Sequence, residues 1–317
     1  MKAVVTSSYG PPEVLGITEL EDPVPRGNEV RIRVRAAAVT ISDCIVRSGK
    51  VHPMLWLPMR AFVGFRGPRA RVLGLDLSGD VDAVGSSVRR FKAGDPVIAF
   101  TGRRFGAYGE YVCLPEDGLR GPPDALVAAK PSNLRYEEAA AVPSRGGLAW
   151  HFLGGGRVRD GQRVLIYGAA GGVGTFAVQI AVLSGARVTG VCGSGNLAFV
   201  ESLGASRVLD YARDEFPGNP ETYDLIFDAV GRRFSGRIHW EGMLARGGRF
   251  ISVDDGNPKL GTDDLLQLRR AIESGRVRPI LDRVYPLERI AEAHRYVEAG
   301  HKRGNVIVSL PDPKLRG

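Results

Sequence analysis

The sequence predicts an α/β protein with two domains, a β-rich domain and a doubly wound parallel sheet. Residues 1–125 contain short apolar segments separated by glycine and proline, whereas residues 126–274 alternate strand-like with helical segments. Residues 275–317 return to the earlier pattern, so we expect them to complete the first domain. A chain of 317 residues is also longer than one small core needs and suits two domains.

The first domain is expected to be a barrel-like arrangement of antiparallel strands. In residues 28–40, Val30, Ile32 and Val34 alternate with arginines, which is the pattern of a half-buried strand. Glycines and the Asp95-Pro96 pair mark corners between strands. Further strands are expected at residues 2–6, 73–84, 95–100 and 107–114.

The second domain is expected to alternate strands with helices, as a parallel sheet requires. It begins with a helical region at 136–153, on both sides of Pro143. We expect strands at 163–167, 186–192, 207–210, 223–229 and 249–253, with helices at about 196–204 and 235–245. The tail adds helices at 265–274 and 287–299 and a last strand at 305–310.

The most informative stretch is RVLIYGAAGGVGTFAVQIA at residues 163–181. A short apolar strand leads into glycines at positions 168, 171, 172 and 174, and a near-continuous apolar helix follows. Glycines allow a tight turn and a close approach of phosphates to the backbone, and the helix N-terminus offers free N–H groups to them. Because strand, turn, helix and next strand all agree, we interpret the stretch as a dinucleotide site; the alternative is an empty turn of the same fold.

The end of the second strand bears on the choice of cofactor. An NAD site usually has Asp or Glu there to hold the ribose 2′-hydroxyl, but this chain has Cys192-Gly193-Ser194-Gly195-Asn196. Ser194 and Asn196 can donate hydrogen bonds to a 2′-phosphate, although the turn contains no Arg or Lys. The sequence therefore favours NADPH over NADH.

Composition excludes several function classes. The hydrophobic fraction of 44% and charged fraction of 25% are ordinary for a globular protein. No apolar run is long enough for a membrane span, so we expect no stable membrane insertion. The net charge of +8 comes from arginines spread over the whole chain without a nucleic-acid motif, so we expect no nucleic-acid partner. A positive field would also attract a phosphorylated cofactor.

The N-terminus and the cysteines indicate a cytoplasmic protein. MKAVVTSSYG lacks a signal-peptide pattern. The three cysteines, Cys44, Cys113 and Cys192, lie far apart in the sequence, which predicts reduced thiols rather than a disulfide framework. No G-x-S-x-G elbow suggests a hydrolase.

With these features located, the chain resembles the medium-chain dehydrogenase/reductase superfamily, and within it the zinc-independent quinone oxidoreductase-like (zeta-crystallin-like) branch. The resemblance implies a GroES-like first domain, a Rossmann-type second domain and a nicotinamide cofactor in the cleft between them. The matching segments are LGLDLSGDVDAVGSSVRRFKAGDPVIAF (73–100), GAYGEYV (106–112), EEAAAVPSRGGLAW (137–150), VLIYGAAGGVGTFAVQIA (164–181), SLGASRVLDY (202–211), YDLIFDAVG (223–231) and GHKRGNVIV (300–308).

The resemblance also bears on metal binding. Zinc alcohol dehydrogenases of the superfamily carry Gly-His-Glu where this chain has Gly74-Leu75-Asp76, and Leu75 cannot ligate a metal. Only Cys113 lies near the position of the family's four-cysteine structural lobe. Cys44 and Asp76 remain as ligands, but two groups without a histidine do not make a zinc site. We therefore expect no zinc.

Without a Lewis acid to stabilise an alkoxide, hydride transfer to an electron-poor acceptor needs less help than alcohol oxidation. The predicted function is therefore an NADPH-dependent reductase of quinones, enones or similar activated carbonyl compounds. An NAD(P)-dependent alcohol dehydrogenase and a non-catalytic NADPH-binding or regulatory protein of the same fold are the alternatives. The expected partner is a small-molecule electron acceptor.

The family pattern implies roles for particular residues. Thr40 and Asp43 would face the nicotinamide and substrate as catalytic residues, and Asp43 alternatively caps the helix that begins near Cys44. Trp56 and Arg145 are the candidate substrate residues, with a solvated charge as the alternative for Arg145. The cofactor-binding residues would be Gly168, Ala169, Gly171, Gly172, Val173, Gly174, Cys192, Ser194, Asn196, Tyr211, Val230, Gly231, Val253 and Asn305.

Two segments depart from the family. Residues 47–72 form a long stretch in which Met54, Trp56 and Phe62 stand among arginines; it is interpreted as a lid over an apolar substrate, a weak membrane-surface patch or a loop packed on the core. Only DDGNPKLGTD (254–263) replaces the longer insertion that usually carries a dimer-forming edge strand. A homodimer through that edge is therefore in doubt, and a homodimer through other contacts stays open.

Overall fold

The computed structural model describes residues 1–51, 53–117, 125–213, 221–236, 238–255 and 261–311. The chain divides into two compact units, Met1–Ser144 with Leu281–Gly317, and Arg145–Ile280. The boundaries therefore lie after those expected from the sequence, 125/126 and 274/275. The reason for the first shift is that helix α3 (Tyr136–Ala140) contacts strands β3, β4 and β14 of the first unit.

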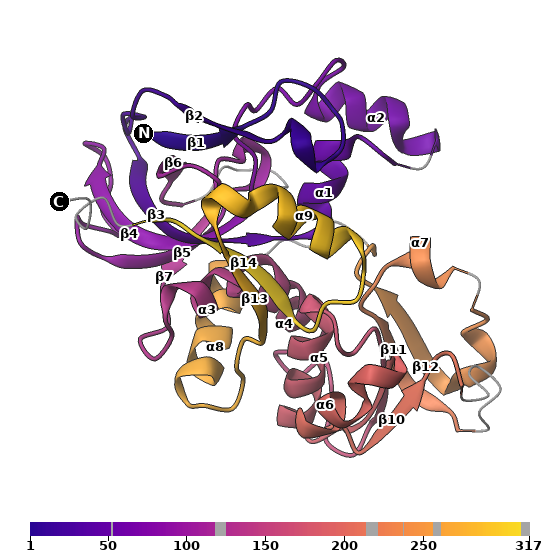
Figure 1. The fold of residues 1–317 in the computed structure, drawn as a ribbon. Helices are drawn as coiled ribbons and strands as arrows, with labels where there is room; N and C mark the ends of the chain where they lie inside the picture. Colours follow the sequence, from indigo (N-terminus) through magenta and orange to yellow (C-terminus); the bar gives the residue numbers. More distant parts are fainter. Residues whose placement is uncertain (52, 118–124, 214–220, 237, 256–260, 312–317) are drawn as a thin grey trace. The chain divides into compact units, whose positions relative to one another are not determined.

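The first unit is built on a seven-stranded sheet (Figure 1). The strand order is β13-β14-β3-β4-β5-β7, and β6 also pairs with β3. Strands β14 and β3 are antiparallel, with Val306 opposite Val39, so the end of the chain joins this sheet. The strands are β3 (Glu29–Val39), β4 (Asp76–Val84), β5 (Pro96–Phe100), β6 (Tyr111–Pro115), β7 (Leu126–Ala129), β13 (Leu281–Pro286) and β14 (Asn305–Ser309).

A small antiparallel sheet and three further helices complete the first unit. Strands β1 (Lys2–Val5) and β2 (Gly16–Glu19) form the small sheet. The helices are α1 (Ile41–Ser48), α2 (Pro53–Val63) and α9 (Ile290–Glu298). Helix α2 lies in the stretch 47–72, for which the sequence predicted no secondary structure.

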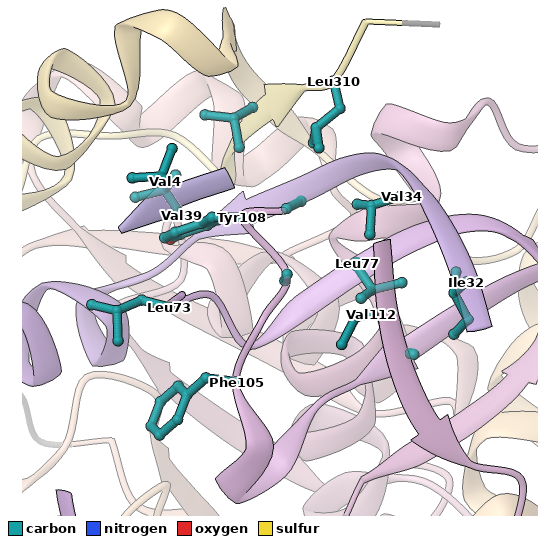
Figure 2. Packing of buried hydrophobic residues seen from close by; sticks show 14 of the residues in the cluster. Val4, Ile32, Val34, Val39, Leu73, Leu77, Phe105, Tyr108, Val112 and Leu310 are labelled. Carbon is teal, nitrogen blue, oxygen red and sulfur yellow. The ribbon is translucent and has the colours of Figure 1, made fainter. Parts of the chain in front are cut away.

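The core of the first unit follows the predicted alternation on β3. Val30, Ile32 and Val34 are buried, whereas the arginines between them are half-buried. Figure 2 shows Ile32 and Val34 of this strand with Leu77 and Val112 of neighbouring strands. The half-buried Arg33 and Arg35 pair with Asp80 of β4, so this side of the sheet carries charge. Strand β3 therefore has one apolar face toward the core and one polar face, as expected for a half-buried antiparallel strand.

The second unit contains a five-stranded parallel sheet, as predicted. Its strand order is β10-β9-β8-β11-β12, so the chain reverses its direction of winding between β8 and β11. That is the doubly wound arrangement whose ligands bind at the carboxyl ends of the strands beside the reversal. The strands are β8 (Arg163–Tyr167), β9 (Arg187–Cys192), β10 (Arg207–Asp210), β11 (Tyr223–Asp228) and β12 (Leu244–Ser252).

The helices of the second unit are α4 (Gly147–Leu153), α5 (Gly172–Leu183), α6 (Leu197–Ser202), α7 (Arg232–Ser235) and α8 (Thr262–Glu273). The predicted helix at 235–245 is wrong. Helix α7 ends at Ser235, and β12 begins at Leu244. Gly248 allows β12 to lie against β11, because a Cβ there would be 2.7 Å from the carbonyl oxygen of Tyr223. In the part of the chain that the structure describes, no helix is long and apolar enough to cross a membrane.

Candidate functional site

The glycine turn joins β8 to α5 as the sequence predicts. Gly168 has a φ of +78°, and the amides of Gly168 and Ala169 both donate to the carbonyl of Val191, each at 3.0 Å. Gly171 is the N-cap of α5, and no side chain caps this helix. The first amide to bond across the cap is that of Thr175, which donates to the carbonyl of Gly171 at 2.9 Å. The N-terminal amides of α5 are therefore positioned to bind an anion.

Two of the glycines are required by close approach. A Cβ on Gly174 would lie 2.1 Å from the carbonyl oxygen of Gly168, so only glycine lets the helix begin beside the turn. A Cβ on Gly168 would lie 2.3 Å from Cγ1 of Val230. A Cβ on Gly171 would meet only the Gly168 oxygen, at 3.3 Å. The turn thus fits the pyrophosphate of a dinucleotide, which needs bare backbone beside a helix N-terminus.

The end of β9 lies beside an acid that sequence reasoning missed. Asp210 ends β10 and pairs in register with Cys192, and its carboxylate accepts a hydrogen bond from the Ser194 hydroxyl at 2.5 Å. This hydrogen bond lowers the pKa of Asp210. Burial raises the pKa of Cys192 to about 11, so its thiol is neutral at physiological pH. The signal that could have found this acid is Asp210 at the end of β10; the sequence analysis looked for an acid only at the end of β9.

Tyr211 and Asn196 border the same place. Tyr211 is 53% exposed, and its hydroxyl would be 3.3 Å from a Cβ on Gly193. The backbone amide of Asn196 donates to the backbone carbonyl of Gly193 at 2.8 Å. The structure therefore brings Cys192, Ser194, Asn196 and Tyr211 together at the carboxyl ends of β9 and β10.

A buried carboxylate shapes the other side of the glycine turn. Asp228, at the end of β11, is fully buried, and one of its oxygens accepts the amides of Val230 and Gly231, both at 3.1 Å. Its other oxygen accepts the hydroxyls of Ser235 at 2.6 Å and Ser252 at 3.0 Å. These bonds hold Val230 against Gly168.

Val253 lies at the same edge, because its amide donates to the carbonyl of Asp228 at 3.0 Å. All the predicted cofactor residues of the second unit therefore follow the carboxyl ends of neighbouring parallel strands, in the order β10, β9, β8, β11 and β12. Sequence reasoning named Val230 and Gly231 but not Asp228, which places them.

In the first unit, Thr40 and Asp43 form a capping box at the start of α1. The Thr40 amide and hydroxyl donate to Oδ2 of Asp43 at 2.8 and 2.6 Å, and the Asp43 amide donates to the Thr40 hydroxyl at 3.3 Å. The capping alternative for Asp43 is therefore observed, with the helix beginning at Ile41 rather than near Cys44. Its chemical role stays a prediction.

Tyr108 and Asn305 lie near this box. Burial, together with the Asp43 carboxylate, raises the pKa of the fully buried Tyr108 well above its usual value, so the phenol stays protonated. Because Val306 pairs with Val39, Asn305 lies beside Thr40 at the end of the β14–β3 ladder. Asn305 is buried, at 4% exposure.

The position of Arg145 is set by its neighbour Ser144. The Ser144 amide and hydroxyl donate to the two carboxylate oxygens of the buried Asp76, at 2.8 and 2.5 Å. Ser144 lies in the π-helical turn Val142–Gly146, which connects α3 to α4 around Pro143. Arg145 follows directly and is half-buried. Asp76, considered in the sequence as a metal ligand, thus anchors this turn.

Cys44 lies beside a histidine, which the sequence analysis did not place near it. Its sulfur is 3.4 Å from Nδ1 of His294, and both residues are buried. Burial lowers the pKa of His294 to about 3 and raises the pKa of the Cys44 thiol, so both groups are neutral. Among the described residues, no group of three or more His, Cys, Asp or Glu side chains could hold a metal ion. All three cysteines are free thiols.

Trp56 lies on α2 and is 46% exposed. Its ring faces the guanidinium of Arg60, with 5.4 Å between the Arg60 Cζ atom and the ring centroid. The segment 254–263 falls partly on residues 256–260, which lie outside the described residues.

Three family models match the chain. Residues 26–124 match the alcohol dehydrogenase GroES-like domain. Residues 172–275 match a zinc-binding dehydrogenase model, and residues 256–308 match a second model of the same description. The two main matches fall on the two units in the predicted order.

Individual proteins are similar over nearly the whole chain. The NADPH-dependent alkenal/one oxidoreductase of Arabidopsis thaliana, a chloroplastic protein, is 32% identical over 334 residues, which cover 97% of this chain and 79% of that protein. A quinone oxidoreductase structure from Coxiella burnetii has a TM-score of 0.85 and 27% identity, covering 98% of this chain and 99% of its own. An NAD-dependent alcohol dehydrogenase structure has a TM-score of 0.82 and 32% identity, covering 98% and 100%.

Proposed function

Because the chain belongs to the medium-chain dehydrogenase/reductase superfamily and is an oxidoreductase with a nicotinamide cofactor, we propose that it reduces quinones, enones or similar activated carbonyl compounds with NADPH. The proposal is supported by the similarity to an alkenal/one oxidoreductase and to a quinone oxidoreductase. The observation that carries it is the bare glycine turn at the uncapped N-terminus of α5.

The cofactor is proposed to bind at the carboxyl edge of the parallel sheet. Gly172 and Val173 present backbone amides to the pyrophosphate, while Ala169, Gly171 and Gly174 keep the turn close to the helix; the Gly171 amide itself donates to the Gly168 carbonyl at 3.0 Å. Val230, Gly231 and Val253 cover the side that follows β11 and β12. When bound, the reduced nicotinamide supplies a hydride to the acceptor. The chain's contribution is to orient the two and to exclude water.

NADPH is proposed to be favoured over NADH by the residues around the adenosine ribose, although the nearby Asp210 carboxylate repels a 2′-phosphate. Asn196 and the exposed Tyr211 are able to donate to a 2′-phosphate. The Ser194 hydrogen is given to Asp210, so this hydroxyl is left to act as an acceptor. Arg213, whose Nε is 3.8 Å from Oδ2 of Asp210, offsets the charge of that acid. NADPH preference thus rests on the balance between Asp210 and Arg213.

Thr40 and Asp43 are proposed to act on the nicotinamide and acceptor side, together with Asn305. A hydride added to an enone requires a proton at the neighbouring carbon, and solvent is able to supply it. The Thr40 hydroxyl gives its hydrogen to Asp43, so its oxygen is left to accept a hydrogen bond from the nicotinamide or the acceptor. The Asp43 carboxylate accepts from Thr40 and fixes the direction of that hydroxyl. Trp56 and Arg145 are proposed as acceptor contacts.

The reaction is proposed to need no zinc. The support lies in the donor set, since Leu75 carries no ligating atom and Asp76 is engaged by Ser144. Alcohol dehydrogenation is the second candidate, because an NAD-dependent alcohol dehydrogenase is among the similar structures. A scaffold without a Lewis acid stabilises an alkoxide poorly, which favours the reductase. The cytoplasmic location and a homodimer stay predictions.

The proposal is tested by two measurements on the purified protein. Fluorescence titration with NADPH and NADH measures binding, and loss of NADPH absorbance with a panel of quinones and enones measures turnover. We expect micromolar or tighter NADPH binding and turnover with at least one acceptor. Oxidation of alcohols with NAD⁺, and no reductase activity, would favour the dehydrogenase; tight NADPH binding without turnover of any acceptor would favour the non-catalytic alternative.

The role of Asp43 is tested with Asp43→Asn. Asparagine keeps a side-chain oxygen that can accept the Thr40 amide in the capping box, so the helix and the urea midpoint are expected to change little. If the carboxylate orients Thr40 for the reaction, kcat falls at least tenfold while the NADPH Kd stays the same. An unchanged kcat would restrict Asp43 to its capping role.

A further inference from the structure

Helix α2 has two faces of different character. Its inner face is held to the N-terminal segment: the Arg60 guanidinium lies 3.7 Å from the centroid of the Tyr9 ring, and the Tyr9 hydroxyl donates to the Gly64 carbonyl at 2.5 Å. Val63 on this face is buried. The opposite face carries Met54, Leu57 and Phe62, which are 82%, 60% and 48% exposed. Figure 1 shows α2 at the periphery of the β-rich unit.

The exposed apolar side chains follow helical spacing. Positions 54, 57, 61 and 62 share one side of a helix, and Phe65, 58% exposed, continues that side just beyond its end. Soluble proteins rarely leave a contiguous group of large apolar side chains in water without a partner. We call the residues Met54, Leu57, Phe62 and Phe65 the apolar face of α2.

The charge around this face has one sign. Residues 44–75 contain six lysines and arginines and no aspartate or glutamate. Four of these, Lys50, Arg66, Arg69 and Arg71, are exposed and make no ion pair with any residue that the structure describes. The buried Arg47 is paired with Glu298, and the exposed Glu13 is paired with Arg295. Exposed positive charge therefore flanks α2 in the sequence, with Lys50 before the helix and the three arginines after it.

We propose that the apolar face of α2 binds reversibly to the surface of an anionic phospholipid bilayer. A helix of 11 residues is too short to span a bilayer, but it is long enough to lie in the interface with its apolar side chains between the headgroups. The four exposed basic residues then contact lipid phosphates, which attract Lys and Arg near the surface. A lipid-soluble acceptor, such as a quinone with an apolar tail, becomes accessible from this position.

The shape and chemistry of the surface favour a bilayer over a protein partner. Proteins that bind an amphipathic helix do so with a matching groove, whereas a fluid bilayer accepts a protruding apolar ridge of any side-chain shape. Met, Leu, Phe and Trp beside several arginines are also the composition of interfacial helices. The binding is weak and reversible, because its strength increases with the apolar area that is buried and only one short helix is involved.

The proposal is tested by flotation of the full chain with vesicles. We expect binding to phosphatidylcholine vesicles that contain about one-third phosphatidylglycerol, and at least tenfold weaker binding to phosphatidylcholine alone. Raising the salt concentration from about 0.1 M to about 1 M shortens the Debye length from ~10 to ~3 Å and is expected to release most of the protein.

Tryptophan emission provides an independent signal. Trp56 contacts Arg60 of the inner face, and the other two tryptophans, Trp150 and Trp240, are 8% and 7% exposed, so none of the three belongs to the apolar face. Phe62→Trp in a Trp56→Phe background places an exposed tryptophan on that face, and vesicle binding is expected to shift its emission to shorter wavelength.

Matched variants separate the apolar and basic contributions. Leu57→Glu with Phe62→Glu is expected to weaken vesicle binding at least tenfold, because each side chain loses its apolar burial. Arg66→Gln with Arg69→Gln is expected to weaken it more than tenfold on anionic vesicles only. The controls make the same kinds of change elsewhere: an exposed apolar residue to glutamate in Val24→Glu, at a side chain 75% exposed, and exposed arginines to glutamine in Arg187→Gln with Arg246→Gln. These should bind like the parent, and all variants should keep the parent's NADPH affinity.

Other outcomes overturn the proposal. Equal flotation with and without anionic lipid would show that the basic residues do not contribute to binding. Equal loss in the control variants would indicate attraction by the overall positive charge of the chain rather than by this surface. Absence of flotation with concentration-dependent dimerisation that Leu57→Glu abolishes would assign the face to a second copy of the chain. Absence of both, with a full loss of kcat in Leu57→Glu, would assign it to a lid over the acceptor.

Discussion

The buried carboxylate of Asp228 is predicted to position the loop that covers the glycine turn. Asp228→Ala removes an acceptor from four donors, two of which are the backbone amides of Val230 and Gly231. Hydrogen bonds to a charged group contribute ~1.5–3 kcal/mol each, so the two amides alone account for about 3–6 kcal/mol of folding free energy. The two serine hydroxyls can rotate, and Ser235 already has a second acceptor in the Gly231 carbonyl at 3.3 Å.

Asp228→Asn separates positioning from stability. The asparagine oxygen can still accept both amides, so Val230 stays against Gly168 and the NADPH Kd is expected to change less than about threefold. In Asp228→Ala the loop is released, and the NADPH Kd is expected to rise at least tenfold. Urea unfolding followed by tryptophan fluorescence gives the stability, and fluorescence titration gives the Kd.

Ser252→Ala is the matched control, because it removes one hydroxyl donor to Asp228 and leaves the amide bonds intact. It is expected to cost about 1 kcal/mol of stability with an unchanged Kd. The positioning role of Asp228 is refuted if Asp228→Ala lowers stability as expected but binds NADPH as tightly as the parent. The loop at Val230 and Gly231 would then not depend on the carboxylate for cofactor binding.

Three further predictions follow from the structure. Gly174→Val, whose Cβ would lie 2.1 Å from the Gly168 oxygen, is expected to abolish NADPH binding in titration, and retained binding would exclude the glycine turn as the phosphate site. Asp210→Asn removes a negative charge beside Ser194 and is expected to raise the ratio of NADPH to NADH affinity by several-fold; an unchanged ratio would place the ribose elsewhere. The pKa of His294 is about 3 in the folded chain and near 6.5 when unfolded, so its contribution to stability is present above pH 6.5 and is lost as the pH falls. Between pH 7 and pH 5 this amounts to about 2 kcal/mol, so the urea midpoint is expected to fall, and His294→Gln should flatten that dependence.

The sequence by itself determined the features that depend on neighbouring residues. The glycines of the turn, the strand before it and the helix after it are local, so the strand, the turn at Gly168–Gly174 and the helix that follows were predicted. The alternation of apolar and basic residues on β3 likewise predicted one buried face. The predicted helix at 235–245 was wrong because apolar and charged residues there fit a helix, whereas pairing with β11 makes the residues from Leu244 onward a strand.

Only the tertiary structure decided which distant residues meet. Asp210 reaches Ser194 because β10 pairs with β9, and Asp228 reaches Ser252 because β11 pairs with β12. Those contacts depend on strand order, which the spacing of residues along the chain does not encode. The two faces of α2 were also hidden in the sequence, since Tyr9 selects the side that is covered and leaves the apolar side exposed. Local chemistry is therefore legible in the chain, whereas the partners of buried polar groups follow from register and packing.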